Sequence, residues 1–309
     1  MPKIGFLFPG QGSQFTGMGK DFAETFPWAA DTYDRARSLL GFDLADVCFN
    51  GPEETLRQTR FTQPALVVHS ALAGRLLREK GIVPAAAAGH SLGEFSAMIA
   101  AGVFSLDSGL ELVRERSRLM SETGIRRPGA MAAVIGLPSE DVRLICEEAE
   151  SSGAGLVRPA NLNSPEQTVI SGSREGVAKA SEIAKAKGAR RVMELAVSGA
   201  FHSPLVAEAA GEFEKLLAGS AFQKPAIPVY ANVSASPVTD AETARECLSR
   251  QMTHPVRWIE TVQNMIQDGI STFYEVGPGK VLAGLVKRID KTAEVIPCGT
   301  VAEISAVSA

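Results

Sequence analysis

Short apolar runs alternate with amphipathic stretches along the first part of the chain, and this pattern predicts strands that alternate with helices. Residues 4–8 form an apolar run typical of a buried strand, and a loop rich in Gly and Gln at 9–14 ends it. A helical pattern follows at 64–80, a strand of small residues at 83–88, and a second helix at 92–101. Strand, turn and helix in this order favour an α/β layer on a largely parallel sheet.

The pattern changes after residue 126. Elements are predicted in the order strand, helix, strand, strand, helix, strand, which is the split βαβ order of ferredoxin-like units. Their ranges are 130–135, 139–151, 156–160, 167–170, 174–187 and 190–197, with a turn at 161–165. We therefore expect a large α/β catalytic domain of residues 1–126 and 198–309 with an inserted small ferredoxin-like α+β domain at 127–197.

Beyond Ser198 the pattern returns to that of the large domain. Helices are expected at 204–217 and 241–252, and strands at 229–233 and 272–276.

Composition and charge exclude several classes of protein. Of 309 residues, 31 are Lys or Arg and 35 are Asp or Glu, a net charge of −4 without a basic block, which disfavours nucleic acid and anionic membranes as partners. The longest uncharged stretch, residues 4–19, is too rich in Gly, Gln and Ser to span a membrane, and nothing resembles a secretory signal. Four cysteines stand far apart without metal-ligand spacing, so we expect buried thiols, no metal and a cytoplasmic protein.

The glycine loop at 9–14 does not fit a nucleotide site. Phe15 stands where a dinucleotide fingerprint needs its third glycine, and no P-loop lysine pattern is present.

The strongest local signal is Gly-His-Ser-Leu-Gly at residues 89–93, a G-x-S-x-G motif between a predicted strand and a predicted helix. Such a turn exposes the Ser91 hydroxyl, and the helix N-terminus offers free N–H groups to an oxyanion. The alternative is that Ser91 is an ordinary helix N-cap.

A nucleophilic serine needs a base, and the chain has four histidines. His69 lies among apolar residues of a predicted helix, which favours a structural role, and His90 is adjacent to Ser91, so it should point away. His254 lies in a turn before proline and could be exposed. His202 precedes a Ser-Pro helix start, so it is expected on a loop where α/β sites collect, and it is the best candidate.

Arg116 carries information about the substrate. On the predicted helix 106–120 it falls within the apolar arc of Val113 and Met120, away from the charged side. A guanidinium on the core side is costly unless an anion meets it, and its planar fork suits a carboxylate. From this pattern alone, a structural ion pair or a side chain that snorkels to solvent is slightly favoured over substrate binding.

Several segments together, in order and over nearly the whole chain, resemble the malonyl-CoA:acyl carrier protein transacylases. The segments are residues 8–14, 89–94, 116 with 119–120, 129–133, 161–165, 200–203, 251–258 and 275–280. The resemblance implies a large hydrolase-like α/β domain with a nucleophile elbow and a ferredoxin-like insertion, which agrees with the boundaries predicted above.

The resemblance also implies roles for individual residues. It implies that Ser91 is the nucleophile, His202 its base and Arg116 the ligand of the malonyl carboxylate. The backbone N–H groups of Gln11 and Leu92 would form the oxyanion hole, and a backbone carbonyl of Gln251 would orient His202. His90, Asn161 and Phe201 would line the pocket. The Phe201 ring would leave little room for a 2-methyl branch, and His254 is a mild departure from the family pattern.

The expected activity is therefore transfer of a malonyl group from malonyl-CoA to the phosphopantetheine thiol of an acyl carrier protein, through a malonyl-serine ester with ping-pong kinetics. No cofactor is expected, and the enzyme is expected to be a monomer. Fatty acid and polyketide synthesis both remain open as pathways. The alternatives are a thioesterase with the same serine, a trans-acting polyketide synthase acyltransferase, and an inactive subunit that binds the carrier protein. Candidate docking residues for the carrier are Arg114, Arg118, Arg126 and Arg127.

Overall fold

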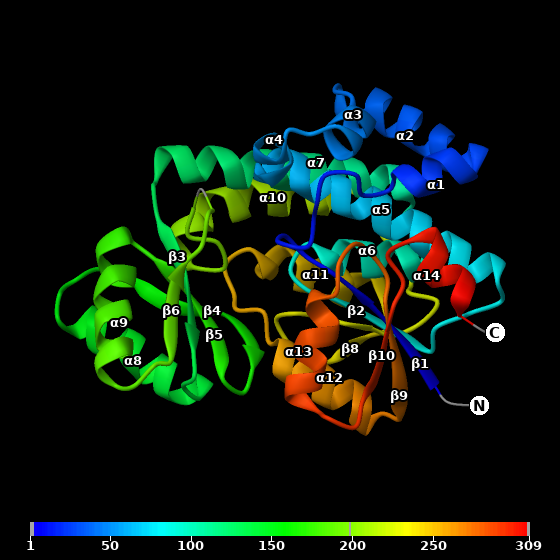
Figure 1. Ribbon diagram of the computed structural model, residues 1–309. Coiled ribbons are helices and arrows are strands. Elements are labelled where there is room, and N and C mark those ends of the chain that lie inside the picture. The colour runs from blue at the N-terminus through cyan, green and yellow to red at the C-terminus, as the bar shows by residue number, and fades with distance from the viewer. Residues whose placement is uncertain (1–2, 198, 308–309) are drawn as a thin grey trace.

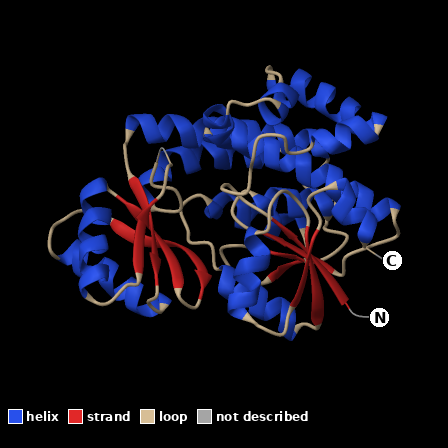
Figure 2. Cartoon of the chain, viewed as in Figure 1, coloured by secondary structure: helices blue, strands red, loops and turns tan. Residues whose placement is uncertain are grey.

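In the computed structural model, which describes residues 3–197 and 199–307, the strands form two separate sheets (Figures 1 and 2). The first has the order β10-β9-β1-β2-β7-β8, and all its neighbours are parallel except β7 and β8. Its strands are β1 (Lys3–Phe8), β2 (Ala86–Gly89), β7 (Val229–Tyr230), β8 (Pro237–Val238), β9 (Ile270–Glu275) and β10 (Glu294–Pro297). The expected mixed α/β class with a largely parallel sheet is confirmed.

The second sheet is antiparallel and has the order β4-β5-β3-β6. Its elements are β3 (Ala130–Ile135), α8 (Ser139–Ser151), β4 (Val157–Ser164), β5 (Gln167–Gly172), α9 (Arg174–Ala186) and β6 (Arg191–Glu194). The two helices lie beside each other on one side of this sheet (Figure 1). Chain order and strand order together are those of a split βαβ unit. The domain boundaries stay a prediction, and Ser198, where the large domain was expected to resume, lies outside the described residues.

Helices surround the first sheet and extend above both sheets in Figure 1. Those before β3 are α1 (Lys20–Thr25), α2 (Pro27–Leu40), α3 (Leu44–Phe49), α4 (Glu53–Arg57), α5 (Thr59–Glu79), α6 (Gly93–Ala100) and α7 (Leu106–Arg126). Those after β6 are the 3-10 helix η1 (Pro204–Val206), α10 (Ala207–Gly219), α11 (Ala241–Gln251), α12 (Trp258–Gln267), α13 (Val281–Ile289) and α14 (Val301–Ala306). Within the described ranges, no helix is long and apolar enough to cross a membrane.

The parallel pairing of β1 with β2 positions the loops that follow them. Both strands are buried from Gly5 and Ala86 onward, as apolar runs at the centre of a parallel sheet should be. Their register pairs Phe8 with Gly89, so both strands end at the same edge of the sheet. The loop after Phe8 therefore lies against the turn after Gly89.

Some predicted boundaries were wrong. α5 begins at Thr59, before the predicted start at Pro64, and α7 continues to Arg126 rather than ending at residue 120. Pro64 therefore lies inside α5, beyond the first four residues whose N–H groups have no intrahelical partner, so the helix continues through it with one hydrogen bond fewer. The expected helix at 204–217 is the 3-10 turn η1 followed by α10.

The predicted turn at 161–165 was also wrong, because β4 continues to Ser164. Irregular register on either side of Asn161 lets this Pro- and Asn-containing segment stay paired with β5. Asn161 also forms a parallel bridge to Val256, which joins the second sheet to the segment before α12.

We predict that Gly93→Ala strongly destabilises the fold. A Cβ atom at Gly93 would lie 2.0 Å from the carbonyl oxygen of Phe8, a backbone atom that cannot move away without distorting β1. The expected loss is about 3 kcal/mol in the free energy of unfolding, measured by urea denaturation. The matched control is Gly211→Ala within α10, where a Cβ would meet nothing within 4 Å, and it should gain up to about 1 kcal/mol. Equal midpoints for the two variants would contradict this account of the contact.

Candidate active site

Ser91 lies on a tight turn between β2 and α6. Its backbone has φ 50°, a left-handed conformation that is unusual for a residue with a side chain. The flanking glycines are required by close contacts: a Cβ at Gly89 would lie 1.9 Å from the carbonyl carbon of Gly93, and one at Gly10 would lie 2.3 Å from the oxygen of His90. The N-cap residue of α6 is Leu92, and no side chain caps it, so the alternative of Ser91 as an ordinary N-cap is wrong.

Asn232, which the sequence analysis missed, holds the Ser91 turn in this conformation. Its Oδ1 accepts a hydrogen bond from the N–H of Ser91 at 2.7 Å, and its Nδ2 donates to the carbonyl of Gly89 at 2.6 Å. The side chain is fully buried just beyond β7. The available signal was a polar residue after an apolar strand, at the sheet edge where α/β sites collect.

His202 contacts the Ser91 hydroxyl directly. Its Nε2 lies 2.8 Å from Oγ of Ser91, and its Nδ1 lies 2.9 Å from the carbonyl oxygen of Gln251 and 3.1 Å from that of His254. Because carbonyls only accept hydrogen bonds, Nδ1 carries the proton and the lone pair of Nε2 faces Ser91. The structure thus brings together Ser91, His202 and the Gln251 carbonyl, while the His254 carbonyl is an acceptor that the sequence analysis missed.

His202 is neutral at physiological pH. Burial lowers the pKa of its imidazole to about 3, and the nearby Arg116 guanidinium contributes further to the decrease. A neutral imidazole with a free Nε2 lone pair can take the proton of a serine hydroxyl.

Arg116 is completely buried beside Ser91. Nη1 donates to Oε1 of Gln63 at 2.7 Å, and Nη2 donates to Oε1 of Gln251 at 2.8 Å and to Oγ of Ser91 at 3.3 Å. Its Nε has no partner, and within the described residues the guanidinium forms no ion pair with Asp or Glu. Burial lowers the pKa of Arg116 to about 10, so it stays cationic at neutral pH. Neither the structural ion pair nor the snorkelling side chain is observed.

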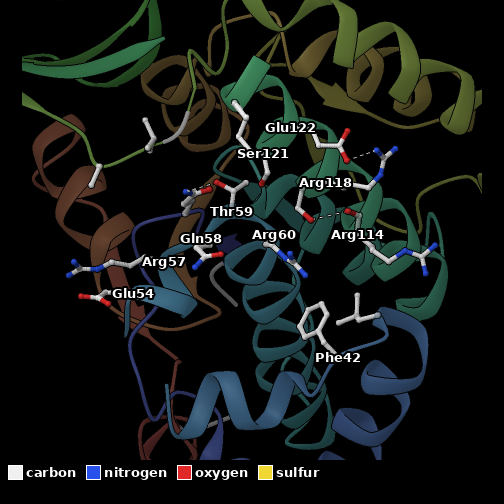
Figure 3. A pocket seen from close by; sticks show the side chains of 16 residues that line it. Phe42, Glu54, Arg57, Gln58, Thr59, Arg60, Arg114, Arg118, Ser121 and Glu122 are labelled. Carbon is white, nitrogen blue, oxygen red and sulfur yellow. Dashed lines mark hydrogen bonds and ion pairs between the residues drawn. The ribbon is translucent and has the colours of Figure 1, made fainter. Parts of the chain in front are cut away.

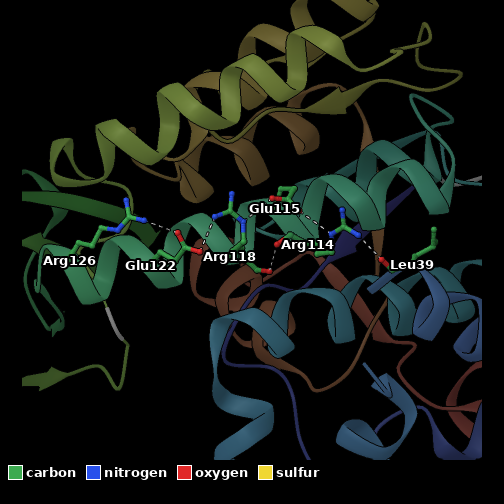
Figure 4. Close-up of polar contacts among 7 residues, drawn as sticks. Leu39, Arg114, Glu115, Arg118, Glu122 and Arg126 are labelled. Carbon is green, nitrogen blue, oxygen red and sulfur yellow. Dashed lines mark hydrogen bonds and ion pairs between the residues drawn. The ribbon is translucent and has the colours of Figure 1, made fainter. Parts of the chain in front are cut away.

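The opposite face of α7 carries the solvated charges that the pattern predicted. Arg118 pairs with both Glu115 and Glu122, and Arg126 also pairs with Glu122 (Figure 4). Arg114 pairs with Glu115. Arg127, the remaining docking candidate, pairs with Glu208. These arginines already have carboxylate partners, of which Glu115 and Glu122 are half-buried and Glu208 is exposed.

Two backbone N–H groups near Ser91 are available to a ligand. Gln11 lies in the loop after β1, and Leu92 follows Ser91 at the start of α6. Neither N–H has an acceptor among the residues that the structure describes. A pair of N–H groups beside a nucleophile is the usual composition of an oxyanion hole.

The other predicted pocket residues form no side-chain hydrogen bond to the Ser91 hydroxyl or to the His202 ring. His90 points away from Ser91, with Nε2 2.7 Å from Oδ1 of Asn163 and its ring edge against Trp258. Asn161 and Phe201 are buried, and neither forms a side-chain hydrogen bond to Ser91 or His202.

The two remaining histidines are held by backbone carbonyls. His69 is buried, with Nε2 2.7 Å from the carbonyl oxygen of Gly299, which fits its predicted structural role. His254 is half-buried rather than exposed, and its Nδ1 lies 2.8 Å from the carbonyl of Arg250.

Two cavities each border one of the candidate site residues, Gln11 in one and His202 in the other. One of about 760 Å³ is lined by side chains from α4, α5 and α7 and includes Gln11, Thr59 and Ser121 (Figure 3). The other, of about 420 Å³, is lined by His202, Pro255 and residues of β4. In the part of the chain that the structure describes, no three metal-binding side chains cluster.

Glu94 is a buried carboxyl group that the sequence analysis did not single out. Its Oε2 accepts a hydrogen bond from Nε2 of Gln251 at 2.6 Å, and burial raises its pKa to about 7. It stands directly after the G-x-S-x-G motif, where a charge at the start of a buried helix is the only sequence signal.

Comparison with known proteins identifies the relatives of this chain. The family model described as an acyl transferase domain matches residues 5–304. The malonyl CoA-acyl carrier protein transacylase of Bacillus subtilis is 43% identical over 96% of this chain and 93% of its own length. An acyl carrier protein S-malonyltransferase from Vibrio cholerae has 42% identity and a TM-score of 0.94 over 99% of this chain and 100% of that one. A malonyl-transacylase solved in complex with its type II PKS acyl-carrier protein has 41% identity and a TM-score of 0.94, with 98% of both chains covered.

The protonation state of His202 is testable with a serine-reactive organophosphate. Because the pKa of His202 lies at about 3, labelling of Ser91 should keep its neutral-pH rate as the pH falls through 6.5, the ordinary imidazole value. Intact mass spectrometry over about pH 4.5 to 8 measures the rate, with His202→Ala as the slow control at every pH. Loss of half the rate near pH 6.5 would show that His202 titrates normally.

Proposed function

This chain belongs to the acyl transferase family, and we propose that Ser91 is its nucleophile, His202 its base and Arg116 its ligand for the acyl carboxylate. The enzyme transfers a malonyl group from malonyl-CoA to an acyl carrier protein, a step that supplies fatty acid or polyketide synthesis. The observation that supports these roles best is one cluster of atoms: Oγ of Ser91 lies 2.8 Å from Nε2 of His202 and 3.3 Å from Nη2 of Arg116.

In the first half-reaction, Oγ of Ser91 attacks the thioester carbonyl while Nε2 of His202 takes its proton. The carbonyl oxygen becomes an oxyanion, and it is stabilised by the N–H groups of Gln11 and Leu92, which have no acceptor among the described residues. When the carbonyl re-forms, the C–S bond breaks, and the imidazolium of His202 gives its proton to the CoA thiolate. A malonyl-serine ester and free CoA result.

In the second half-reaction, the phosphopantetheine thiol of the carrier protein attacks the ester, and His202 takes the thiol proton. The C–O bond breaks and Ser91 recovers its proton from His202. Carbonyl acceptors at Nδ1 of His202 keep the imidazole in the same tautomer for both halves.

Arg116 gives the site its preference for a malonyl group. A buried cation with only neutral hydrogen-bond partners favours an incoming carboxylate strongly. Holding the carboxylate also fixes the thioester carbonyl against the oxyanion hole, which favours attack by a positioned thiol over attack by water. Names of relatives likewise favour transfer over hydrolysis, and an intact Ser91–His202 pair does not favour an inactive binding subunit.

We also propose roles for the remaining pocket residues, the absence of a further cofactor, and the location and oligomeric state of the enzyme. His90 orients Asn163 behind the turn, Asn161 lines the cleft, and Phe201 restricts branched acyl groups. No cofactor beyond the carrier's phosphopantetheine is needed, since the groups above supply every proton transfer. A cytoplasmic monomer is proposed because one chain supplies the whole cluster and all four cysteines, which lie within the described residues, are free and buried.

The Ser91→Ala variant tests the nucleophile. After mixing with radiolabelled malonyl-CoA, it should form no covalent adduct, because no other hydroxyl hydrogen-bonds to His202 Nε2 among the described residues. Wild-type protein should give a labelled ester that is discharged by carrier protein with its phosphopantetheine attached. A normal adduct yield in Ser91→Ala would remove Ser91 from the mechanism.

The Arg116→Ala variant tests the carboxylate site. Its kcat/KM with malonyl-CoA should fall on the order of 100-fold, while acetyl-CoA, which lacks the carboxylate, should become a relatively better substrate. The measurement is the rate of CoA release with each substrate. As a control on the same helix, Arg118→Ala removes a solvated arginine and should leave the malonyl-to-acetyl ratio unchanged. An unchanged ratio in Arg116→Ala would contradict the assignment.

A further inference from the structure

Arg116 is a buried cation whose compensating charge is held one amide away. Nη2 of Arg116 donates to Oε1 of Gln251 at 2.8 Å, and Nε2 of the same amide donates to Oε2 of Glu94 at 2.6 Å. Arg116, Gln251 and Glu94 are each at most 1% exposed. The Gln251 amide therefore lies between a buried guanidinium and a buried carboxyl group.

This arrangement leaves the guanidinium available. A carboxylate in direct contact would occupy the planar fork of Arg116, as bidentate arginine–carboxylate pairs do. With Glu94 behind Gln251, the Nε of Arg116 has no partner among the described residues, and its Nη2 makes a long contact with Oγ of Ser91. The negative charge still lies close enough to stabilise the cation in the absence of substrate.

Binding of a substrate carboxylate would change the electrostatic environment of Glu94. Two carboxylates would then face a single guanidinium in a site with little water, and like charges in such a site do not both stay ionised. Glu94 is the one with incomplete hydrogen bonding: its Oε1 is buried without a partner, and the N–H of Asn232 reaches Oε2 only at 3.4 Å.

We propose that Glu94 is the exchangeable counter-ion of Arg116: ionised Glu94 takes up a proton from solvent when the malonyl carboxylate binds to Arg116. Glu94 is then a positioning and specificity residue that makes malonyl binding, and not acetyl binding, dependent on a proton. This inference rests on the proposed role of Arg116 as the carboxylate ligand.

The neighbouring titratable groups stay in one form over the relevant pH range. Arg116 from α7 and Cys247 from α11 interact with the charge of Glu94, and His202 interacts in turn with Arg116. Burial raises the pKa of the Cys247 thiol to about 11 and lowers that of His202 to about 3, whereas it raises the pKa of Glu94 to about 7. Glu94 is thus the member of this cluster that changes charge near neutral pH.

The pKa of Glu94 determines how malonyl binding depends on pH. Below about pH 7 Glu94 is already protonated, and malonyl binding needs no further proton. Above that pH the proton must come from solution, so binding weakens as pH rises. A bound-state pKa that is higher by about one unit corresponds to a tenfold change.

The experiment compares the acylation of Ser91 by malonyl-CoA with that by acetyl-CoA. Stopped-flow detection of the released CoA measures both rates. For the wild type, the malonyl-to-acetyl ratio of kcat/KM should fall about tenfold between about pH 6 and pH 8.5. The nucleotide phosphates of CoA are common to both substrates and cancel in the ratio. In Glu94→Gln, which keeps the shape and an acceptor for Gln251 but cannot ionise, the ratio should change less than about twofold.

The matched control is Glu275→Gln. Glu275 is also completely buried with a pKa raised by burial to about 7, but its oxygens accept from the N–H groups of Leu282 and Ala283 at the start of α13. This variant should keep the wild-type fall in the ratio. A Glu94→Gln ratio that falls as steeply as in the wild type would overturn the proposal.

Proton uptake by the wild type gives a test that needs no variant. In weakly buffered solution at about pH 7.5, midway between the free and bound pKa values of Glu94, an indicator dye should report about half a proton more per enzyme molecule with malonyl-CoA than with acetyl-CoA, and equal uptake would overturn the proposal. The Arg116→Ala variant distinguishes a wrong carboxylate site from a wrong role for Glu94. If that variant keeps its malonyl preference, the carboxylate site itself is wrong. If it loses the preference while Glu94→Gln keeps the pH dependence, only the role of Glu94 is wrong.

Discussion

The site depends on the close contact between the ends of β1 and β2. The carbonyl of Phe8 accepts the N–H of His90 at 3.0 Å, and the same oxygen would lie 2.0 Å from a Cβ at Gly93. At this separation, the loop that carries Gln11 and the first turn of α6 must lie together. The left-handed φ of Ser91 lies within this contact region, as does the N–H of Leu92, which has no acceptor among the described residues.

The electrostatics of the site follow from burial rather than from ion pairing. His202 is oriented by carbonyl dipoles where a triad would place a carboxylate. A carboxylate at Nδ1 would stabilise the imidazolium form of His202. With neutral carbonyls at Nδ1, and with burial and Arg116 lowering its pKa, the imidazolium of His202 is a stronger acid. A strong acid suits the role proposed for His202, which is to return the proton to a departing thiolate or serine in each half-reaction.

The features that sequence reasoning could find are local. The serine motif depends on residues within one turn, and β3 and α8 were predicted to the residue because periodicity describes a segment by itself. Arg116 could be found because an arginine in an apolar arc conflicts with its helix. The helices α1 to α4 and α12 to α14 were not predicted, since most are short and gain their stability from packing against the core.

The features that were missed come from distant parts of the chain. Asn232 and the His254 carbonyl meet the serine turn and His202 across long sequence separations. The position of Asn232 after an apolar strand is a weak signal, and nothing in the sequence around His254 indicates that its carbonyl meets His202. The continuation of β4 through Asn161 likewise depends on pairing with β5 and Val256, which local Asn and Pro content could not reveal.

The neutral amide of Gln251 connects Arg116 with Glu94, and the backbone carbonyl of the same residue contacts His202. Its carbonyl holds His202, its Oε1 accepts from Arg116, and its Nε2 donates to Glu94 and to the carbonyl of Ser91. A carboxylate at this position would pair with Arg116 and exclude an anionic substrate, and an apolar side chain would leave a buried cation and a buried carboxyl group without partners. Only a group that accepts at one end and donates at the other can connect Glu94 to Arg116 while leaving the guanidinium free. In the proposed mechanism, the preference for a carboxylate therefore depends on the amide as well as on the arginine.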